Sequence, residues 1–136
     1  MSKIMTLDIL TPERTVCCLE ADFVVARAVD GEVGIMWNHA PLVVALDIAP
    51  IRYRKDGAEH EISVCGGFME VKDNRISVIT PSAETEQEID VRRAAAAKER
   101  AEKRLVAPTP DIDVERAELA LRRAMLRLRI AEHVRR

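Results

Sequence analysis

The spacing of hydrophobic residues changes near Thr85, and this change divides the chain into two kinds of structure. From Met5 to Thr80, apolar and polar residues alternate with a period of two, which is typical of half-buried β-strands. After Thr85 the apolar residues recur at spacings of three and four, as they do on an amphipathic helix. The sequence therefore predicts an α+β chain, with a β domain over residues 1–84 and a helical domain over residues 85–136.

The helical part is interrupted at Pro108 and Pro110. Proline lacks an N–H group and disfavours helix in the residue before it, so two helices must meet here. The apolar stripes are Ala94, Ala97, Ala101 and Leu105 before the break and Val114, Ala117, Leu121, Ala124, Leu128 and Ala131 after it. Because alanine buries little area, we expect an antiparallel two-helix hairpin that is only marginally stable alone and can open.

Polar residues near the expected helix starts have the chemistry of N-caps. Thr85 and Glu88 have the spacing of a capping box, in which two side chains satisfy two otherwise unpaired N–H groups. Asp111 or Asp113 can cap the second helix, since a short side-chain oxygen is the preferred acceptor at that position.

The part with period two contains eight candidate strands, separated by turn signals such as Asp56-Gly57. Short strands at this spacing predict an antiparallel β-sandwich or flattened barrel at the N-terminal end. The candidate strands are Met5–Leu10, Thr15–Glu20, Phe23–Val29, Leu42–Ile48, Ile51–Lys55, Glu59–Val64, Gly67–Val71 and Arg75–Thr80. The predicted core includes Phe23, Val25, Ile62, Val64, Ile76 and Val78.

A loop is predicted from Asp30 to Leu42, and it holds Met36, Trp37 and His39. The only tryptophan of the chain has two interpretations that the sequence leaves equally open. Trp37 can cover the core, or it can contact a partner protein together with Met36 and His39, because aromatic residues are favoured in interfaces. For His39 itself we expect a hydrogen bond that stabilises the turn, since no nucleophile or acid stands beside it in a catalytic arrangement.

Charge is distributed unevenly along the chain, although the net charge is only −2. Residues 1–86 carry 8 Lys and Arg against 14 Asp and Glu, whereas residues 87–136 carry 13 against 9. The β part is therefore acidic and the helical part basic, which predicts an anionic partner for the helices. The alternative is a solvated charged face without a partner.

No motif in the sequence indicates an enzyme active site or a metal centre. A P-loop, a Rossmann glycine fingerprint, an H-E-x-x-H pair and a G-x-S-x-G elbow are all absent. Cys17, Cys18 and Cys65 lack the spacing of zinc ligands, and without a signal peptide we expect them to be reduced cytoplasmic thiols. No apolar run reaches the roughly 20 residues that span a bilayer. We therefore expect no catalytic residue, no metal and no required cofactor.

Five short motifs follow one another in a specific order and are followed by the helical hairpin. They are Leu7–Arg14, Gly31–Ile35, Asn38–Leu42, Gly66–Val71 and Asn74–Val78. In this order the chain resembles the epsilon subunit of bacterial F-type ATP synthase over nearly its whole length. It departs from that family at Trp37, where smaller residues or proline are common, and at Cys65, where serine is common.

This resemblance implies a fold, a place and a role. The implied fold is an N-terminal β-sandwich followed by a C-terminal helical hairpin. The implied place is the central stalk, where the family binds the gamma subunit, the ring of c subunits and the catalytic alpha and beta subunits. There it lies at the cytoplasmic face of the bacterial membrane, attached only through the complex. The implied role is non-catalytic: the sandwich couples ring rotation to the catalytic head, and the hairpin restrains ATP hydrolysis.

The resemblance also implies ATP as a regulatory ligand of the folded hairpin. Family members that bind ATP carry the motif Ile/Leu-Asp-x-x-Arg-Ala and further arginines on both helices. The matching residues are Glu84, Ile89, Asp90, Arg93, Ala94, Arg100, Arg123 and Arg127. The residues alone leave a simpler alternative open, in which Asp90 and Arg93 form an ordinary pair on one helix.

Two other functions compete with this interpretation. A nucleic-acid-binding module could use the basic helices, but Phe23, Trp37, Tyr53 and Phe68 all precede the hairpin, so no aromatic side chain on it could stack on bases. We therefore expect no nucleic acid as partner. A free adaptor could instead dimerise through the heptad-like second helix, and concentration-dependent self-association would reveal it.

Overall fold

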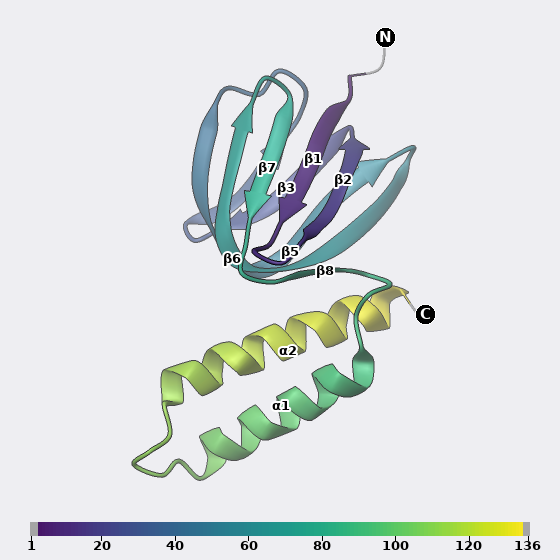
Figure 1. Cartoon of the computed structure of the whole chain (residues 1–136). Helices are drawn as coiled ribbons and strands as arrows, with labels where there is room; N and C mark the ends of the chain where they lie inside the picture. Colours follow the sequence, from purple (N-terminus) through teal and green to yellow (C-terminus); the bar gives the residue numbers. More distant parts are fainter. Residues whose placement is uncertain (1–2, 135–136) are drawn as a thin grey trace. The chain divides into compact units, whose positions relative to one another are not determined.

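The computed structural model describes residues 3–134 and divides into two compact units after Glu86. The first unit is a β-sandwich and the second a pair of helices (Figure 1). The boundary expected from the sequence lies two residues earlier. The sandwich extends to Glu86 because strand β8, Ala83–Thr85, pairs with the sheet and the Glu86 carboxylate accepts a hydrogen bond from the Glu61 N–H.

One continuous sheet, folded over on itself, forms the sandwich. Its order is β2-β1-β7-β6-β5-β3-β4, with β8 added to β6. All neighbouring strands are antiparallel except β1 and β7, which are parallel. The strands are β1 Met5–Leu10, β2 Thr15–Ala21, β3 Phe23–Ala28, β4 Gly31–Ile35, β5 Leu42–Lys55, β6 Ala58–Lys72, β7 Arg75–Ile79 and β8 Ala83–Thr85.

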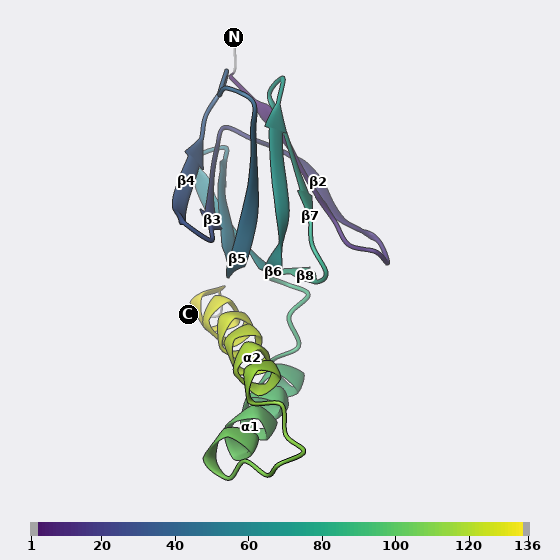
Figure 2. The same ribbon diagram turned by 90° about the vertical axis from the view of Figure 1, so that its left-hand side faces the viewer.

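The two long strands β5 and β6 are shared between the layers, as Figures 1 and 2 show. Strand β7 pairs with the second half of β6, while β8 pairs with its first half. The sequence predicted each long strand as two short ones, divided near Pro50 and near Gly66, and this was wrong. Proline removes only one ladder donor, and Pro50 stays extended opposite Ser63, so β5 continues through it.

Strand β4 lies inside the segment that was predicted to be a loop. Its two glycines, Gly31 and Gly34, hide the alternation of Val33 and Ile35. The glycine at position 34 has a packing role, because a Cβ there would lie 3.5 Å from the ring of Phe23. A short edge strand made of such residues therefore resembles a loop in sequence.

The sandwich core was predicted correctly for β6 and β7 and with the wrong phase for β3. Phe23 and Val25 are only partly buried, whereas Val24 is fully buried. The reason is the register with β5, which places Phe23 opposite Arg54 and Val25 opposite Arg52 on the outer face. The buried cluster is Met5, Leu7, Ile9, Ala21, Val24, Ala26, Ile35, Leu46, Ile51, Ile62, Val64, Met69, Val71, Ile76, Val78 and Ala83.

The second unit consists of α1, Val91–Val106, and α2, Val114–Val134. The predicted capping box is wrong, because Thr85 is held in β8 opposite Ile62 and the helix starts later. Asp90 caps α1 instead: its Oδ1 accepts a hydrogen bond of 3.1 Å from the Arg93 N–H. Asp113 caps α2 in the same way, accepting from the Arg116 N–H at 3.0 Å, which confirms one of the two expected caps.

The two helices run antiparallel and pack against each other (Figures 1 and 2). Their buried residues are mainly small, as the apolar stripes predicted: Ala94 and Ala101 on α1, and Ala117, Ala124 and Ala131 on α2. Leu126 and Ile130 are also buried, although they lie outside the predicted stripe.

Gly67 has the least room of the five glycines and generates a stability prediction. It has a φ of +99°, and a Cβ there would lie 2.8 Å from the Cα of Thr80 and overlap the Ile79 carbonyl. We expect Gly67→Ala to lower the free energy of unfolding by about 3 kcal/mol, through backbone strain and overpacking. Thermal or denaturant unfolding of the purified chain measures this loss.

Gly57 offers a matched control for that substitution. It also has a positive φ, +79°, but no atom lies within 4 Å of the Cβ position. Gly57→Ala should therefore cost only the backbone term, roughly 1 kcal/mol. Equal losses for the two variants would contradict the close approach of β6 to β7.

Candidate functional site

The loop after β4 is a tight, hydrogen-bonded turn. Asn38 has a φ of +63°, and its N–H donates to the Asn74 side-chain oxygen at 2.7 Å. The His39 N–H donates to the Met36 carbonyl at 3.1 Å, and the His39 Nδ1 lies 2.7 Å from the Ala40 carbonyl, to which it can only donate. The expected role of this histidine in stabilising the turn is confirmed.

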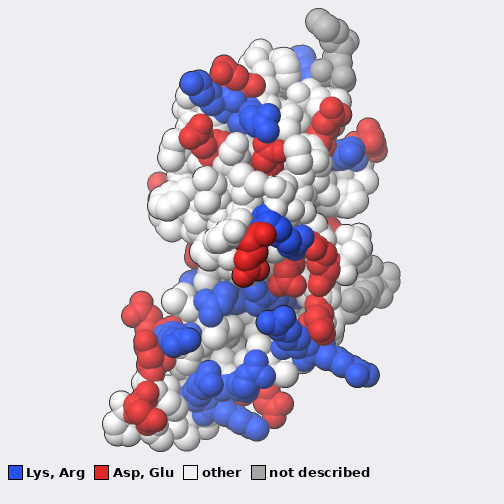
Figure 3. Space-filling view, viewed as in Figure 1, with Lys and Arg blue, Asp and Glu red and all other residues white. Residues whose placement is uncertain are grey.

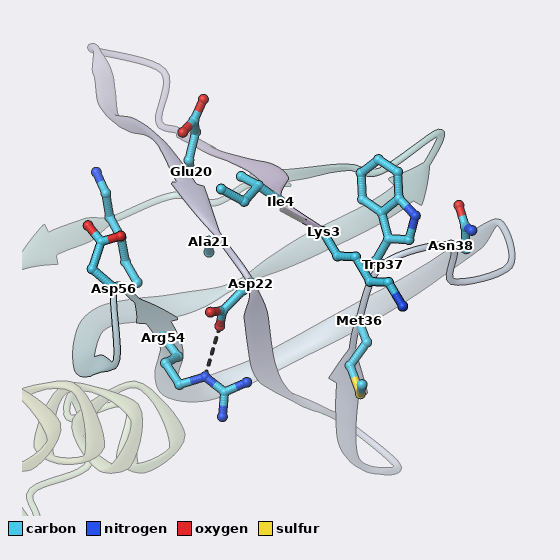
Figure 4. Close-up of a pocket in the computed structure, with 11 residues that line it drawn as sticks. Lys3, Ile4, Glu20, Ala21, Asp22, Met36, Trp37, Asn38, Arg54 and Asp56 are labelled. Atoms are coloured by element: carbon cyan, nitrogen blue, oxygen red, sulfur yellow. Dashed lines mark hydrogen bonds and ion pairs between the residues drawn. The ribbon is translucent and has the colours of Figure 1, made fainter. Parts of the chain in front are cut away.

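A pocket of about 710 Å³ opens beside this turn (Figure 4). Met36 and Trp37, directly after β4, and Ile4, directly before β1, are among the residues that line it. Trp37 is 39% exposed and Met36 60% exposed, so neither is a buried cover of the core. The salt bridge between Arg54 and Asp22, 2.8 Å long, forms part of the wall. A partner contact through Met36, Trp37 and His39 remains a prediction, and His39 lies outside the lining.

An exposed apolar row crosses four strands of the sandwich, and sequence reasoning missed it. Leu10 on β1 pairs with Ile79 on β7, Ile79 pairs with Phe68 on β6, and Phe68 pairs with Ala45 on β5. Cross-strand partners point to the same face of a sheet. The side chains of Ile79 and Phe68 are 63% and 60% exposed, and that of Leu10 is 37% exposed.

This row, with Val43 two residues before Ala45, is called the apolar row below. Alternation along one strand identifies the buried face only if the other face is polar. Here both faces carry apolar residues at the strand ends, so the pattern could not separate them. A contiguous exposed apolar patch of this kind marks an interaction surface.

The hairpin brings basic side chains from two helices to one side. Arg93, Arg100 and Arg123 each directly precede a buried alanine of the helix contact. Since a helix turns about 100° per residue, each arginine lies on the flank of that contact. When two helices run antiparallel, the residues that directly precede the contact residues lie on the same side of both helices. Lys and Arg side chains accordingly gather over α1 and α2 in Figure 3.

The positions along the helices also match. Arg93 lies thirteen residues before the end of α1, and Arg127 lies thirteen residues after the start of α2, so the two are level. Arg100 and Arg123 lie six and nine residues from the same ends, which offsets them by about 4.5 Å. Arg127 follows Arg123 by one turn, so the four arginines predicted for ATP binding lie on one face within two neighbouring levels.

The other predicted nucleotide-binding residues lie at the start of α1 or before it. Asp90 caps the helix through Oδ1, a role that the sequence analysis did not assign to it, and its part in nucleotide binding stays a prediction. Ile89 and Ala94 are buried. Glu84 stands in β8, opposite Ser63, and belongs to the first unit, whereas the others belong to the second.

The cysteines and acidic residues do not assemble into a metal site within the described part of the chain. Cys18 is exposed on β2, and its hydrogen bond to Asp8 raises the pKa of its thiol. The same Asp8 carboxylate is nearly buried and forms a salt bridge of 2.5 Å with Arg75. Neither helix among residues 3–134 combines the length and the apolar character of a membrane span.

Comparisons with known proteins agree with the division into two units. Residues 4–86 match the family described as ATP synthase, Delta/Epsilon chain, beta-sandwich domain. Residues 87–132 match ATP synthase, Delta/Epsilon chain, long alpha-helix domain.

Curated relatives match along nearly their whole length. The chain is 51% identical to the ATP synthase epsilon chain of Desulforamulus reducens, covering 97% of this chain and 100% of that one. It is 53% identical to the epsilon chain of Symbiobacterium thermophilum, covering 93% and 92%.

A solved structure shares the fold at low sequence identity. A chain of the Euglena gracilis mitochondrial ATP synthase, in a structure of OSCP, F1 and the c-ring, superposes with a TM-score of 0.78 at 22% identity. The match covers 98% of this chain and 84% of that one. On the sequence matches in both units, this chain belongs to the ATP synthase delta/epsilon family, among its epsilon chains.

Proposed function

We propose that this chain is the non-catalytic epsilon subunit of a bacterial F-type ATP synthase and that its hairpin is an ATP-responsive brake on hydrolysis. The sandwich fixes the subunit in the central stalk, at the cytoplasmic face of the membrane and attached to it only through the complex. The observation that supports the regulatory part is the hairpin itself. It is a separate unit, its two helices pack through buried alanines, and arginines from both helices lie on one face.

The sandwich offers two surfaces for stalk partners. The apolar row suits the gamma subunit, because an exposed row across four strands can bury a large area without uncompensated charge. The loop with Met36, Trp37 and His39 suits a second contact, with the c-ring, through its exposed tryptophan. Both surfaces belong to one rigid sheet, so rotation of one partner would be passed to the other.

The apolar row generates the first functional prediction. Phe68→Glu places a charge in the middle of the row, where docking would have to desolvate it, and should weaken binding to the gamma subunit at least about tenfold. Co-purification from cells and a binding titration with purified gamma measure this. Val29→Glu is the control, because Val29 is 69% exposed but lies outside the row. Equal retention of gamma by the two variants would exclude the row as the docking surface.

ATP suits the face of the closed hairpin that carries Arg93, Arg100, Arg123 and Arg127, which is called the arginine face below. Arginines from both helices, at two levels, can bind the phosphates of one triphosphate. Each charge-assisted hydrogen bond contributes about 1.5–3 kcal/mol. Ordering the hairpin reduces the sum, which places the affinity in the micromolar to millimolar range. Asp90 lies beside these arginines and is suited to hold the adenine amine. Because ATP contacts both helices only when the hairpin is closed, it shifts the population toward that state.

Calorimetry on the isolated chain tests the nucleotide site. Arg93→Ala and Arg127→Ala should each weaken ATP binding about tenfold or more, because each removes a charged partner of the phosphates. Arg92→Ala and Arg129→Ala are matched controls: both are exposed, and each lies two residues before a buried alanine, so it points away from the helix contact. An absence of heat at several millimolar ATP, or equal losses in all four variants, would rule out the site.

The brake is tested in the assembled enzyme. Deleting residues 111–136 should raise ATP hydrolysis at low ATP while the complex stays intact, because the basic second helix can no longer reach the catalytic subunits. Arg93→Ala should act in the opposite direction at millimolar ATP, since the hairpin is then harder to close. A deletion that leaves the hydrolysis rate unchanged would refute the brake and leave the stalk role standing.

A further inference from the structure

The arginine face continues beyond the four residues that a triphosphate needs. Arg104 lies one turn after Arg100 on α1, and Arg116 precedes the buried Ala117 just as Arg123 precedes Ala124. Arg104 lies two residues before the end of α1, and Arg116 lies two residues after the start of α2. The two are therefore level with each other, next to the loop that joins the helices. Six arginines therefore form three levels on one face: Arg93 with Arg127, Arg100 with Arg123, and Arg104 with Arg116.

Five of the six arginines on this face have no carboxylate partner in the part of the chain that the structure describes. They are Arg93, Arg100, Arg104, Arg116 and Arg123. The acids nearest in sequence to the loop end have other roles. Asp113 caps α2, and Asp111 accepts a hydrogen bond from the Thr109 hydroxyl, which lowers its pKa. Closing the hairpin thus brings like charges together, and a multivalent anion would relieve the repulsion.

The three levels span eleven residues, or about 16 Å along the axis. A triphosphate held at the first two levels leaves Arg104 and Arg116 without an anion. We propose that this face binds linear inorganic polyphosphate, whose repeating charge can follow all three levels. The proposal rests on the same closed hairpin as the proposed nucleotide site and extends that site to the loop.

A phosphate chain fits this face better than a nucleic acid does. The face offers guanidinium groups at three successive levels, and these suit a row of phosphates. It offers no aromatic side chain for bases, since the aromatic residues of the chain all precede α1. A chain that contacts both helices at three levels binds the closed hairpin only, so it closes the hairpin without any adenine.

The test uses the isolated full chain and four probes: ATP, inorganic tripolyphosphate, longer inorganic polyphosphate, and a single-stranded oligonucleotide of comparable charge. The test variant is a double variant that carries both Arg104→Gln and Arg116→Gln. Its control is the double variant Arg92→Gln and Arg129→Gln, which removes the same charge from the side of the helices opposite their contact. Calorimetry gives the affinities, and hydrogen exchange of amides along the alanine contact reports closure.

We expect the longer chain to bind at least about tenfold tighter than tripolyphosphate and to slow exchange along the alanine contact. The Arg104 and Arg116 pair variant should lose about tenfold or more for the longer chain and should not weaken ATP, because removing two like charges eases closure. The control pair should change the polyphosphate affinity about twofold at most, since exposed charges act weakly at a distance.

Two results would overturn the proposal. One is an equal loss of polyphosphate binding in the two pair variants, and the other is oligonucleotide binding as tight as that of polyphosphate. Failure of the nucleotide site is distinguishable from these. If ATP does not bind but the longer chain still depends on Arg104 and Arg116, only the nucleotide site fails. If ATP binds and the longer chain gains nothing over tripolyphosphate, only this inference fails.

Discussion

The fully buried residues of the apolar stripes on α1 and α2 are all alanines, and these small side chains limit how much area the hairpin contact buries. Burial stabilises by about 25 cal/mol per Å², so a small side chain contributes far less than a leucine at the same place. The buried alanines are Ala94 and Ala101 on α1 and Ala117, Ala124 and Ala131 on α2. With so weak an apolar term, charge on the flank can decide whether the hairpin is closed or open.

The sandwich is built in the opposite way. Its core is filled by large aliphatic side chains, and its two longest strands run through both layers, so no part of it can separate without exposing the rest. Gly67 allows β6 to approach β7 closely, and the nearly buried Asp8 is paired with Arg75 across β1 and β7. The chain therefore combines a rigid sandwich with a hairpin whose contact is thin.

Elements defined by a strong local pattern could be predicted from the sequence. Strand β1 has the predicted ends, and the break between the helices falls where the two prolines are. The errors share one cause, which is that partners far along the chain overrode local signals. Pro50 stays in a strand because β6 pairs alongside it, and Thr85 stays out of helix α1 because Ile62 holds it in the sheet. Phe23 points outward because Arg54 is its neighbour on β5.

The sequence by itself determined the two kinds of structure, the acidic and basic halves, and the arginines that precede the alanines of each helix. These features depend on residue spacing alone, because a helix repeats every 3.6 residues and a strand every two. The tertiary structure decided which of these residues act together. Strand pairing gathered Leu10, Ile79 and Phe68 into one exposed row, and the antiparallel helices placed Arg93 level with Arg127. Neither arrangement can be read from one segment, because each joins residues from separate elements.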